Sequence, residues 1–196
     1  MKKLLLSTTL LAGLFGMQAH ADYVAPSPSV ASQAAQYSIM DINSLTKAAK
    51  AGQAGAQFYL ATKYQYGKDI QKDERQAFAW YKAAADQGLA VAQLNVGRML
   101  ADGMGTRKDE ALARQYFEKA ASRGDNRASF NLAMMEEKKK NYMGAYQWYE
   151  LSTRDGMLDN KVITLSEGRK TALAANLTQE QIRQARDRAD RWIQAQ

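Results

Sequence analysis

A spacing of 36 residues runs through the middle of the chain. Gly52, Gly88 and Gly124 lie 36 residues apart, and the residues between them match at the same shift. A period of this length indicates one supersecondary unit that is repeated along the chain. The matching positions are small or apolar: Ala56, Ala92 and Ala128; Leu60, Val96 and Leu132; Ala61, Gly97 and Ala133.

Each unit is predicted to be a helix hairpin. The apolar spacing i, i+4, i+5, i+8 gives the first half one buried helical stripe, and the acidic pairs Asp73-Glu74 and Asp109-Glu110 suit the start of a second helix. One hairpin cannot bury its apolar face alone, so the hairpins must stack. An aromatic pair stands eight residues before each closing glycine, and we expect it to fill the space between helices: Trp80-Tyr81, Tyr116-Phe117 and Trp148-Tyr149.

The composition favours helices and excludes several kinds of active site. Alanine is abundant, β-branched residues are scarce, and both prolines lie before residue 29, which argues against a β-sandwich, a barrel or a parallel sheet. The chain has no cysteine, and its single histidine is His20. Beyond His20, zinc sites of His and Cys, Ser-His-Asp triads, cysteine nucleophiles and haem ligation by His or Cys are excluded. We expect no metal, no cofactor and no catalytic residue.

Residues 1–21 are predicted to be an export signal. Lys2-Lys3 precede an apolar stretch from Leu4 to Met17, and Ala19-His20-Ala21 matches an A-x-A cleavage site. Cleavage between Ala21 and Asp22 would release the protein into the periplasm or out of the cell. Because no cysteine is present to carry a lipid, we expect no lipid anchor. No later stretch approaches about 18 uninterrupted apolar residues, so we expect no stable membrane insertion either.

The remaining chain divides into a linker and one domain. Residues 22–40 are rich in Ser, Ala and Gln without sustained apolar periodicity, which predicts a flexible linker. The all-α domain, an α-solenoid of stacked antiparallel hairpins, covers 41–196 and ends in a cap over 156–196. In the cap, Thr178 and Gln181 predict a capping box. The repeat units lie at about 52–87, 88–123 and 124–155.

The charge pattern does not indicate a nucleic-acid partner. Lys2 and Lys3 account for two of the 27 basic residues, so the exported chain would keep 25 basic and 20 acidic side chains. The longest cationic run, 138–140, directly follows Glu136-Glu137, which is typical of a solvated helix face. We therefore expect no nucleic-acid binding, and weak binding to anionic polymers of the cell envelope stays open.

The motifs within one unit resemble a known repeat family. They are small-x-x-x-Leu-small in the first helix, Tyr-x-x-Gly from Tyr64 to Gly67, and Ala-x-x-Trp-Tyr-x-x-Ala-Ala-x-x-Gly from Ala77 to Gly88. This pattern resembles the Sel1-like repeats, relatives of the tetratricopeptide repeats, in an exported bacterial form without cysteines. The third unit departs from the pattern, because it is four residues shorter and has no loop glycine. The resemblance implies a periplasmic, non-catalytic scaffold, adaptor or regulator that binds a peptide or protein.

The resemblance also implies a binding site on the concave face, which the first helices would line. An extended peptide would place apolar side chains in pockets there, while Arg98 would bind an acidic group. Three of the positions are also apolar at helical spacing, so burial between helices is the alternative for Phe58, Leu94 and Phe130. The full set is Phe58, Thr62, Tyr66, Leu94, Asn95, Arg98, Phe130, Asn131 and Met134.

Three other functions stay open at this point. Some Sel1-like proteins are thought to act as immunity proteins, which here would neutralise a delivered toxin in the periplasm. An envelope hydrolase would need a catalytic set, and Ser44 to Lys47 spell S-x-x-K without a following S-D-N or K-T-G. We interpret this match as a helix start with Ser44 as its N-cap. The last alternative is a binder of peptidoglycan or other polyanions.

Overall fold

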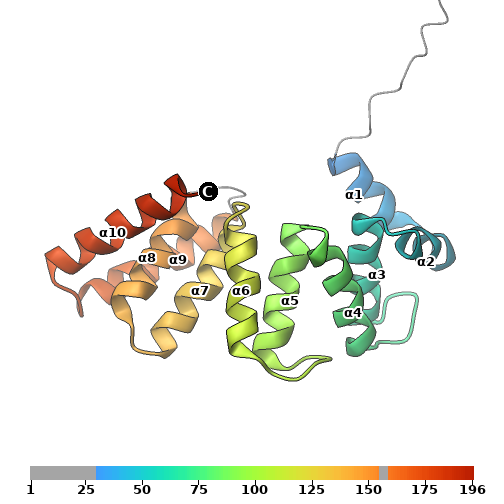
Figure 1. Cartoon of the computed structure of the whole chain (residues 1–196), viewed down its shortest axis with the longest axis horizontal. Helices are drawn as coiled ribbons and strands as arrows, with labels where there is room; N and C mark the ends of the chain where they lie inside the picture. The colour runs from blue at the N-terminus through green and yellow to red at the C-terminus, as the bar shows by residue number, and fades with distance from the viewer. Residues whose placement is uncertain (1–29, 155–158) are drawn as a thin grey trace, which may run out of the picture.

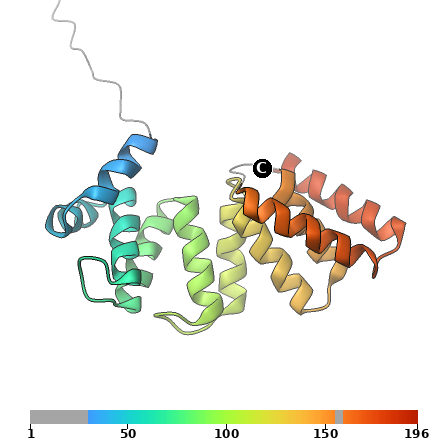
Figure 2. The same ribbon diagram turned by 180° about the vertical axis from the view of Figure 1, so that it is seen from behind.

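The computed structural model describes residues 30–154 and 159–196, which form ten helices and no strand (Figure 1). The helices follow one another along an extended array, with α1 and α2 at one end and α9 and α10 at the other (Figure 2). From α2 to α9, each helix packs against the next one in the chain. The all-α solenoid that the repeat predicts is confirmed.

Three hairpins form the middle of the array. They are α3 (Ala54–Tyr66) with α4 (Glu74–Asp86), α5 (Ala90–Asp102) with α6 (Glu110–Ala121), and α7 (Asn126–Lys138) with α8 (Tyr142–Arg154). The helices α1 (Val30–Ile39) and α2 (Ile42–Lys50) precede them, and α9 (Asn160–Ala174) and α10 (Gln179–Gln194) follow. Within each hairpin the first helix carries the small-residue stripe and the second carries the aromatic pair.

The hairpin loops begin and end at residues that the repeat marks. Asp73 and Asp109 cap α4 and α6, because their carboxylates accept hydrogen bonds from backbone N–H groups of the first turn. Gly67 and Gly103 end α3 and α5 in the left-handed conformation, with φ of 67° and 75°. The third hairpin has no such glycine, and Lys140 takes the positive φ of 60° in its shorter loop.

The repeated small residues form the core between helices. An added Cβ at Gly97 would lie 2.6 Å from the Phe117 ring, so this position tolerates no side chain unless the ring moves. The aromatic pairs pack inside as expected, with Tyr81, Phe117 and Tyr149 almost completely buried. The equivalent small and apolar positions are fully buried as well: Ala56, Leu60, Ala61, Ala92, Val96, Ala128, Leu132 and Ala133.

The C-terminal helix closes the array as the sequence predicts. Thr178 and Gln181 form the reciprocal capping box at the start of α10. This helix packs on α8, and the Trp192 ring meets the Trp148 ring edge to face at 4.8 Å between centroids. The stripe that faces α8 consists of Ile182, Ala185 and Ala189.

The N-terminal part differs from the prediction in two places. Residues 30–39 of the expected linker form α1, and Tyr37 of this helix donates a hydrogen bond to Gln53 at 2.9 Å. Alanine and glutamine favour a helix, and packing on α3 adds the contact that sequence periodicity does not reveal. The N-cap of α2 is Asp41 and not Ser44. The expected signal and residues 22–29 lie outside the described residues, and no described helix is both long enough and apolar enough to span a membrane.

Candidate partner-binding site

The nine predicted site residues lie on α3, α5 and α7, three on each helix. Because the units repeat, equivalent positions on these helices point to the same side of the array. Tyr66 is 73% exposed and Met134 is 47% exposed, and Arg98 is exposed as well. These three side chains are available to a partner.

The apolar row of the predicted site, Phe58, Leu94 and Phe130, belongs to the packing between helices. Leu94 is only 3% exposed and is therefore a core residue, which removes it from the candidate site. Phe58 is half-buried with its ring centroid 5.5 Å from that of Tyr81. Phe130 lies in the same way at 5.5 Å from Tyr149. The structure thus favours the alternative of burial for this row.

The polar residues Thr62, Asn95 and Asn131 of the predicted set form hydrogen bonds within their own hairpins. The Thr62 hydroxyl donates to the Phe58 carbonyl and shares a hydrogen bond with the Tyr81 hydroxyl, both at 3.0 Å. Asn95 and Asn131 each donate to the backbone carbonyl four residues earlier. Within 30–154 and 159–196 neither Asn side-chain oxygen accepts a hydrogen bond, so both stay available as acceptors on this face.

A cavity of about 430 Å³ brings two of the predicted residues together with eight others. It lies where the end of α5, the start of α6 and the second half of α7 meet. Its size falls within the range of pockets that enclose small ligands or side chains. The lining residues are Ala101, Asp102, Lys108, Glu110, Phe117, Asn131, Met134, Met135, Lys138 and Lys139.

The rim of this cavity is charged. The Glu110 carboxylate lies 3.0 Å from the Lys138 ammonium and 3.1 Å from the Lys108 ammonium. These two cations hold the pKa of Glu110 below its ordinary value, so the carboxylate is ionised near neutral pH. Among the described residues, Asp102 and Lys139 form no ion pair. The rim therefore offers both signs of charge, with one more ammonium than carboxylate.

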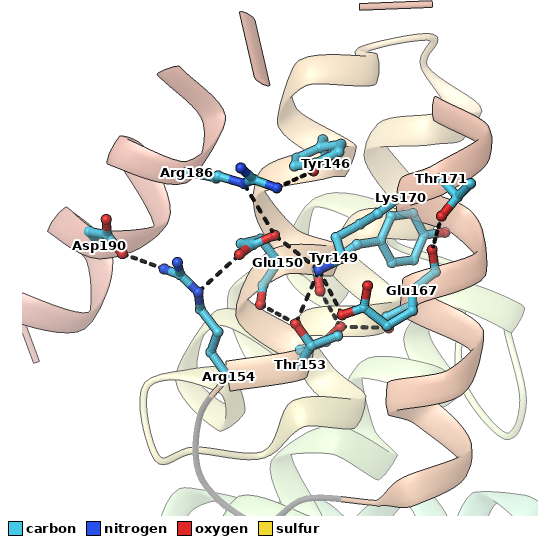
Figure 3. A network of polar contacts seen from close by, with 12 residues as sticks. Tyr146, Tyr149, Glu150, Thr153, Arg154, Glu167, Lys170, Thr171, Arg186 and Asp190 are labelled. Carbon is cyan, nitrogen blue, oxygen red and sulfur yellow. Dashed lines mark hydrogen bonds and ion pairs between the residues drawn. The ribbon is translucent and has the colours of Figure 1, made fainter. Parts of the chain in front are cut away.

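A second polar cluster joins the cap to the third hairpin (Figure 3). The Glu150 side chain is only 8% exposed, and its carboxylate lies 3.0 Å from the Lys170 ammonium and 2.9 Å from the Arg154 guanidinium. On the α10 side, Arg186 donates to the Tyr146 hydroxyl at 3.2 Å, and Asp190 pairs with Arg154. These contacts tie α9 and α10 to α8.

The S-x-x-K match and the buried Lys170 take part in structural contacts. Between 30 and 154 and between 159 and 196, no three His, Cys, Asp or Glu side chains gather closely enough to hold a metal ion. The S-x-x-K match lies at the start of α2, where the Ser44 side chain is exposed and its backbone N–H donates to Asp41. Lys170, which is mostly buried, is occupied by ion pairs with Glu150 and Glu167.

Sequence reasoning missed both the cavity and the cap cluster. The second unit has Ala101 where the other two units have a polar residue, and Phe117 where they have a tyrosine. This difference between units is the sequence feature that could have indicated the cavity. Besides Arg154, the partners of Glu150 are Lys170 and, at 3.9 Å, Arg186. These two lie 20 and 36 residues further along the chain, in a part without repeats, so no period indicates them.

Comparison with known proteins identifies the family. The Sel1 repeat matches residues 54–89, 90–125 and 127–157, which together make up more than half of the chain. The chain belongs to the Sel1 repeat family. Sel1 repeat proteins generally mediate protein–protein interactions, and the family is typically a non-catalytic scaffold.

Two solved structures are similar to this Sel1 repeat protein. A Sel1 repeat protein from Oxalobacter formigenes is 32% identical, with a TM-score of 0.55, over 65% of this chain and 98% of that one. A protective antigen of uropathogenic Escherichia coli with an SLR fold is 25% identical, with a TM-score of 0.47, over 76% of this chain and 40% of that one. A search of the curated proteins found no match.

Proposed function

We propose that this Sel1 repeat protein is an exported scaffold or adaptor that binds a peptide or protein partner in the periplasm, without catalysing a reaction. The observation that carries the proposal is the surface that α3, α5 and α7 share. Tyr66, Arg98 and Met134 are exposed there on three successive hairpins. An aromatic, a guanidinium and a thioether side chain on one surface match the residue types that protein interfaces favour.

The charge of this surface supports a protein partner over a simple polyanion. Arg98 forms no ion pair among the described residues, while the cavity rim beside it includes Asp102 and Glu110. A polyanion site concentrates cations without acidic neighbours, because each carboxylate repels the polymer. The mixture of charge and apolar surface instead favours a partner with a defined pattern of side chains.

The test is a crosslinked pull-down from periplasmic extract with the purified protein. The variant Tyr66→Ala, Arg98→Glu changes two exposed side chains on the proposed face, so we expect it to keep its fold. Arg188→Glu is the matched control, because Arg188 is exposed on α10 and forms no ion pair among the described residues. Circular dichroism checks the helix content of both variants.

We expect wild type and Arg188→Glu to capture the same protein and Tyr66→Ala, Arg98→Glu to lose it. Equal capture by all three would contradict the proposed face, and capture that moderate salt abolishes in every case would indicate a polyanion binder. A captured toxin would assign the immunity role, and turnover of a muropeptide would support the hydrolase. The same periplasmic extract tests the predicted location, because the protein found in it should begin at the predicted cleavage site.

A further inference from the structure

The three hairpins differ in one side-chain hydrogen bond between their two helices, which we call the bridge. In the first hairpin the Tyr81 hydroxyl donates to the Gln65 side-chain oxygen at 2.8 Å, and in the third the Tyr149 hydroxyl donates to Glu137 at 2.8 Å. The bridging residues occupy equivalent repeat positions. In the second hairpin these two positions are held by Phe117 and Ala101, which can form no such bridge.

The cavity lies where this bridge is missing. Ala101 and Phe117 both line it, so the short side chain and the absent hydroxyl leave space that the other hairpins fill. Met134 and Met135 of α7 line it as well. Methionine is flexible and polarizable, and it adapts to apolar groups of different shape. The second hairpin therefore presents an apolar recess that its neighbours, by their sequence, do not form in the same way.

The surroundings of the recess are cationic on balance. Lys108 and Lys138 share the single carboxylate of Glu110, so this trio keeps one positive charge. Lys139 and Asp102, which form no ion pair among the described residues, offset each other in charge. Arg98, one helical turn before Asp102 on α5, adds a further positive charge. An acidic side chain next to an apolar one would complement this combination of charge and recess.

We propose that this cavity is the anchor pocket of the partner-binding face, and that it takes one apolar side chain from a segment that carries Asp or Glu beside it. The inference rests on the proposed function and names the kind of sequence that the partner presents. A buried apolar anchor provides most of the affinity in many interfaces, and the surrounding charges select the partner.

The structure supplies a variant that fills the pocket with native chemistry. Ala101→Gln, Phe117→Tyr places in the second hairpin the pair that the first hairpin already contains, at equivalent positions. We expect this variant to fold, because the same two side chains are accommodated at Gln65 and Tyr81. The matched control is Gln65→Ala, Tyr81→Phe, which makes the reverse change away from the pocket.

The experiment begins with a random 12-residue peptide library displayed on phage and selected on the immobilised wild-type protein. Recovered peptides are synthesised with a fluorescein label, and their dissociation constants are measured by fluorescence anisotropy. We expect a Leu, Met or Phe next to Asp or Glu in the recovered peptides. The pocket-filling variant should weaken their binding by about tenfold or more, as for loss of an interface anchor, while the control stays within about twofold.

The outcomes separate this inference from the proposed function. Peptides that bind the filled variant as tightly as wild type, that lack an apolar anchor, or that are not recovered at all would overturn the anchor pocket. If peptides are recovered that overturn the pocket in this way but lose binding to Tyr66→Ala, Arg98→Glu, the proposed face stands and only the pocket is wrong. Replacement of the peptide's acidic residue by its amide should weaken binding at low salt and have less effect at high salt.

Discussion

Neutralisation of Glu150 gives a sharp test of how the cap is held. Glu150 and Lys170 are both at least nine-tenths buried in their side chains, and the Lys170 ammonium lies 3.0 Å from the carboxylate. Glu150→Gln keeps the shape but leaves the Lys170 charge without its buried partner. Breaking a buried pair in this way costs about 3–5 kcal/mol, but the exposed Glu167, 2.8 Å from Lys170, retains part of the interaction. We therefore expect a loss of about 2–3 kcal/mol.

The loss should be local, because a repeat array is stabilised by contacts between neighbouring units. The cluster joins α8 to α9 and α10, so these helices should open first, while α3 and α4 at the other end keep their stability. Hydrogen exchange resolved by peptide mass spectrometry measures this difference, and thermal unfolding measures the total. A cost of this size corresponds to a decrease of about 4–12 °C in the unfolding midpoint of a chain of this length.

A second variant decides whether the charge or the packing is responsible. Glu150→Leu, Lys170→Met removes both charges together, and replacing a buried pair by apolar groups is often neutral or stabilising. The double variant should therefore recover most of what Glu150→Gln loses. If Glu150→Gln changes stability by less than about 0.5 kcal/mol, or loosens α3 and α4 as much as α10, the reasoning is wrong.

Three further predictions follow from the core and the N-terminus. Gly97→Ala should cost about 1 kcal/mol, because the new Cβ would lie 2.6 Å from the Phe117 ring; Gly168→Ala, where nothing lies within 4 Å, should stabilise by about 0.5–1 kcal/mol in the same urea titrations. Burial raises the pKa of Tyr81 from 10.0 to about 12. Its contribution to stability is therefore complete below pH 10 and is lost as the pH rises towards 12. In Tyr81→Phe the urea midpoint of unfolding should depend less on pH over this range. Mass spectrometry of the protein from a periplasmic fraction should find an N-terminus at Asp22, and an uncleaved chain would contradict export by this signal.

The hairpins were predictable because their causes repeat. Every unit needs small residues where its helices approach and an aromatic pair where it meets its neighbour, so the period itself predicts both helices. The capping box at Thr178 was predictable for a local reason, because its two hydrogen bonds lie within one turn. Local and periodic causes thus account for most of the fold.

The remaining features depend on contacts that neither a period nor a local motif contains. The helix α1 packs through Tyr37 on α3, and Glu150 finds partners on two later helices. The burial of Leu94 is a third case, because an apolar residue at helical spacing suits a groove and a core equally well. Only the stacking of the neighbouring hairpin decides between them.

Differences between units are where a repeat protein can carry specificity. The residues that all units share are explained by stacking, so they give no information about a partner. The equivalent positions Thr62, Arg98 and Met134 differ in size and charge, although the backbone around them repeats. Phe117 and Ala101 stand where the other units have a tyrosine and its polar partner, so the second hairpin lacks a partly buried hydrogen bond and has a cavity, both of which tend to cost stability. Stacking does not explain this loss of stability, whereas a binding pocket would. This is the physical reason to look for the partner at the second hairpin.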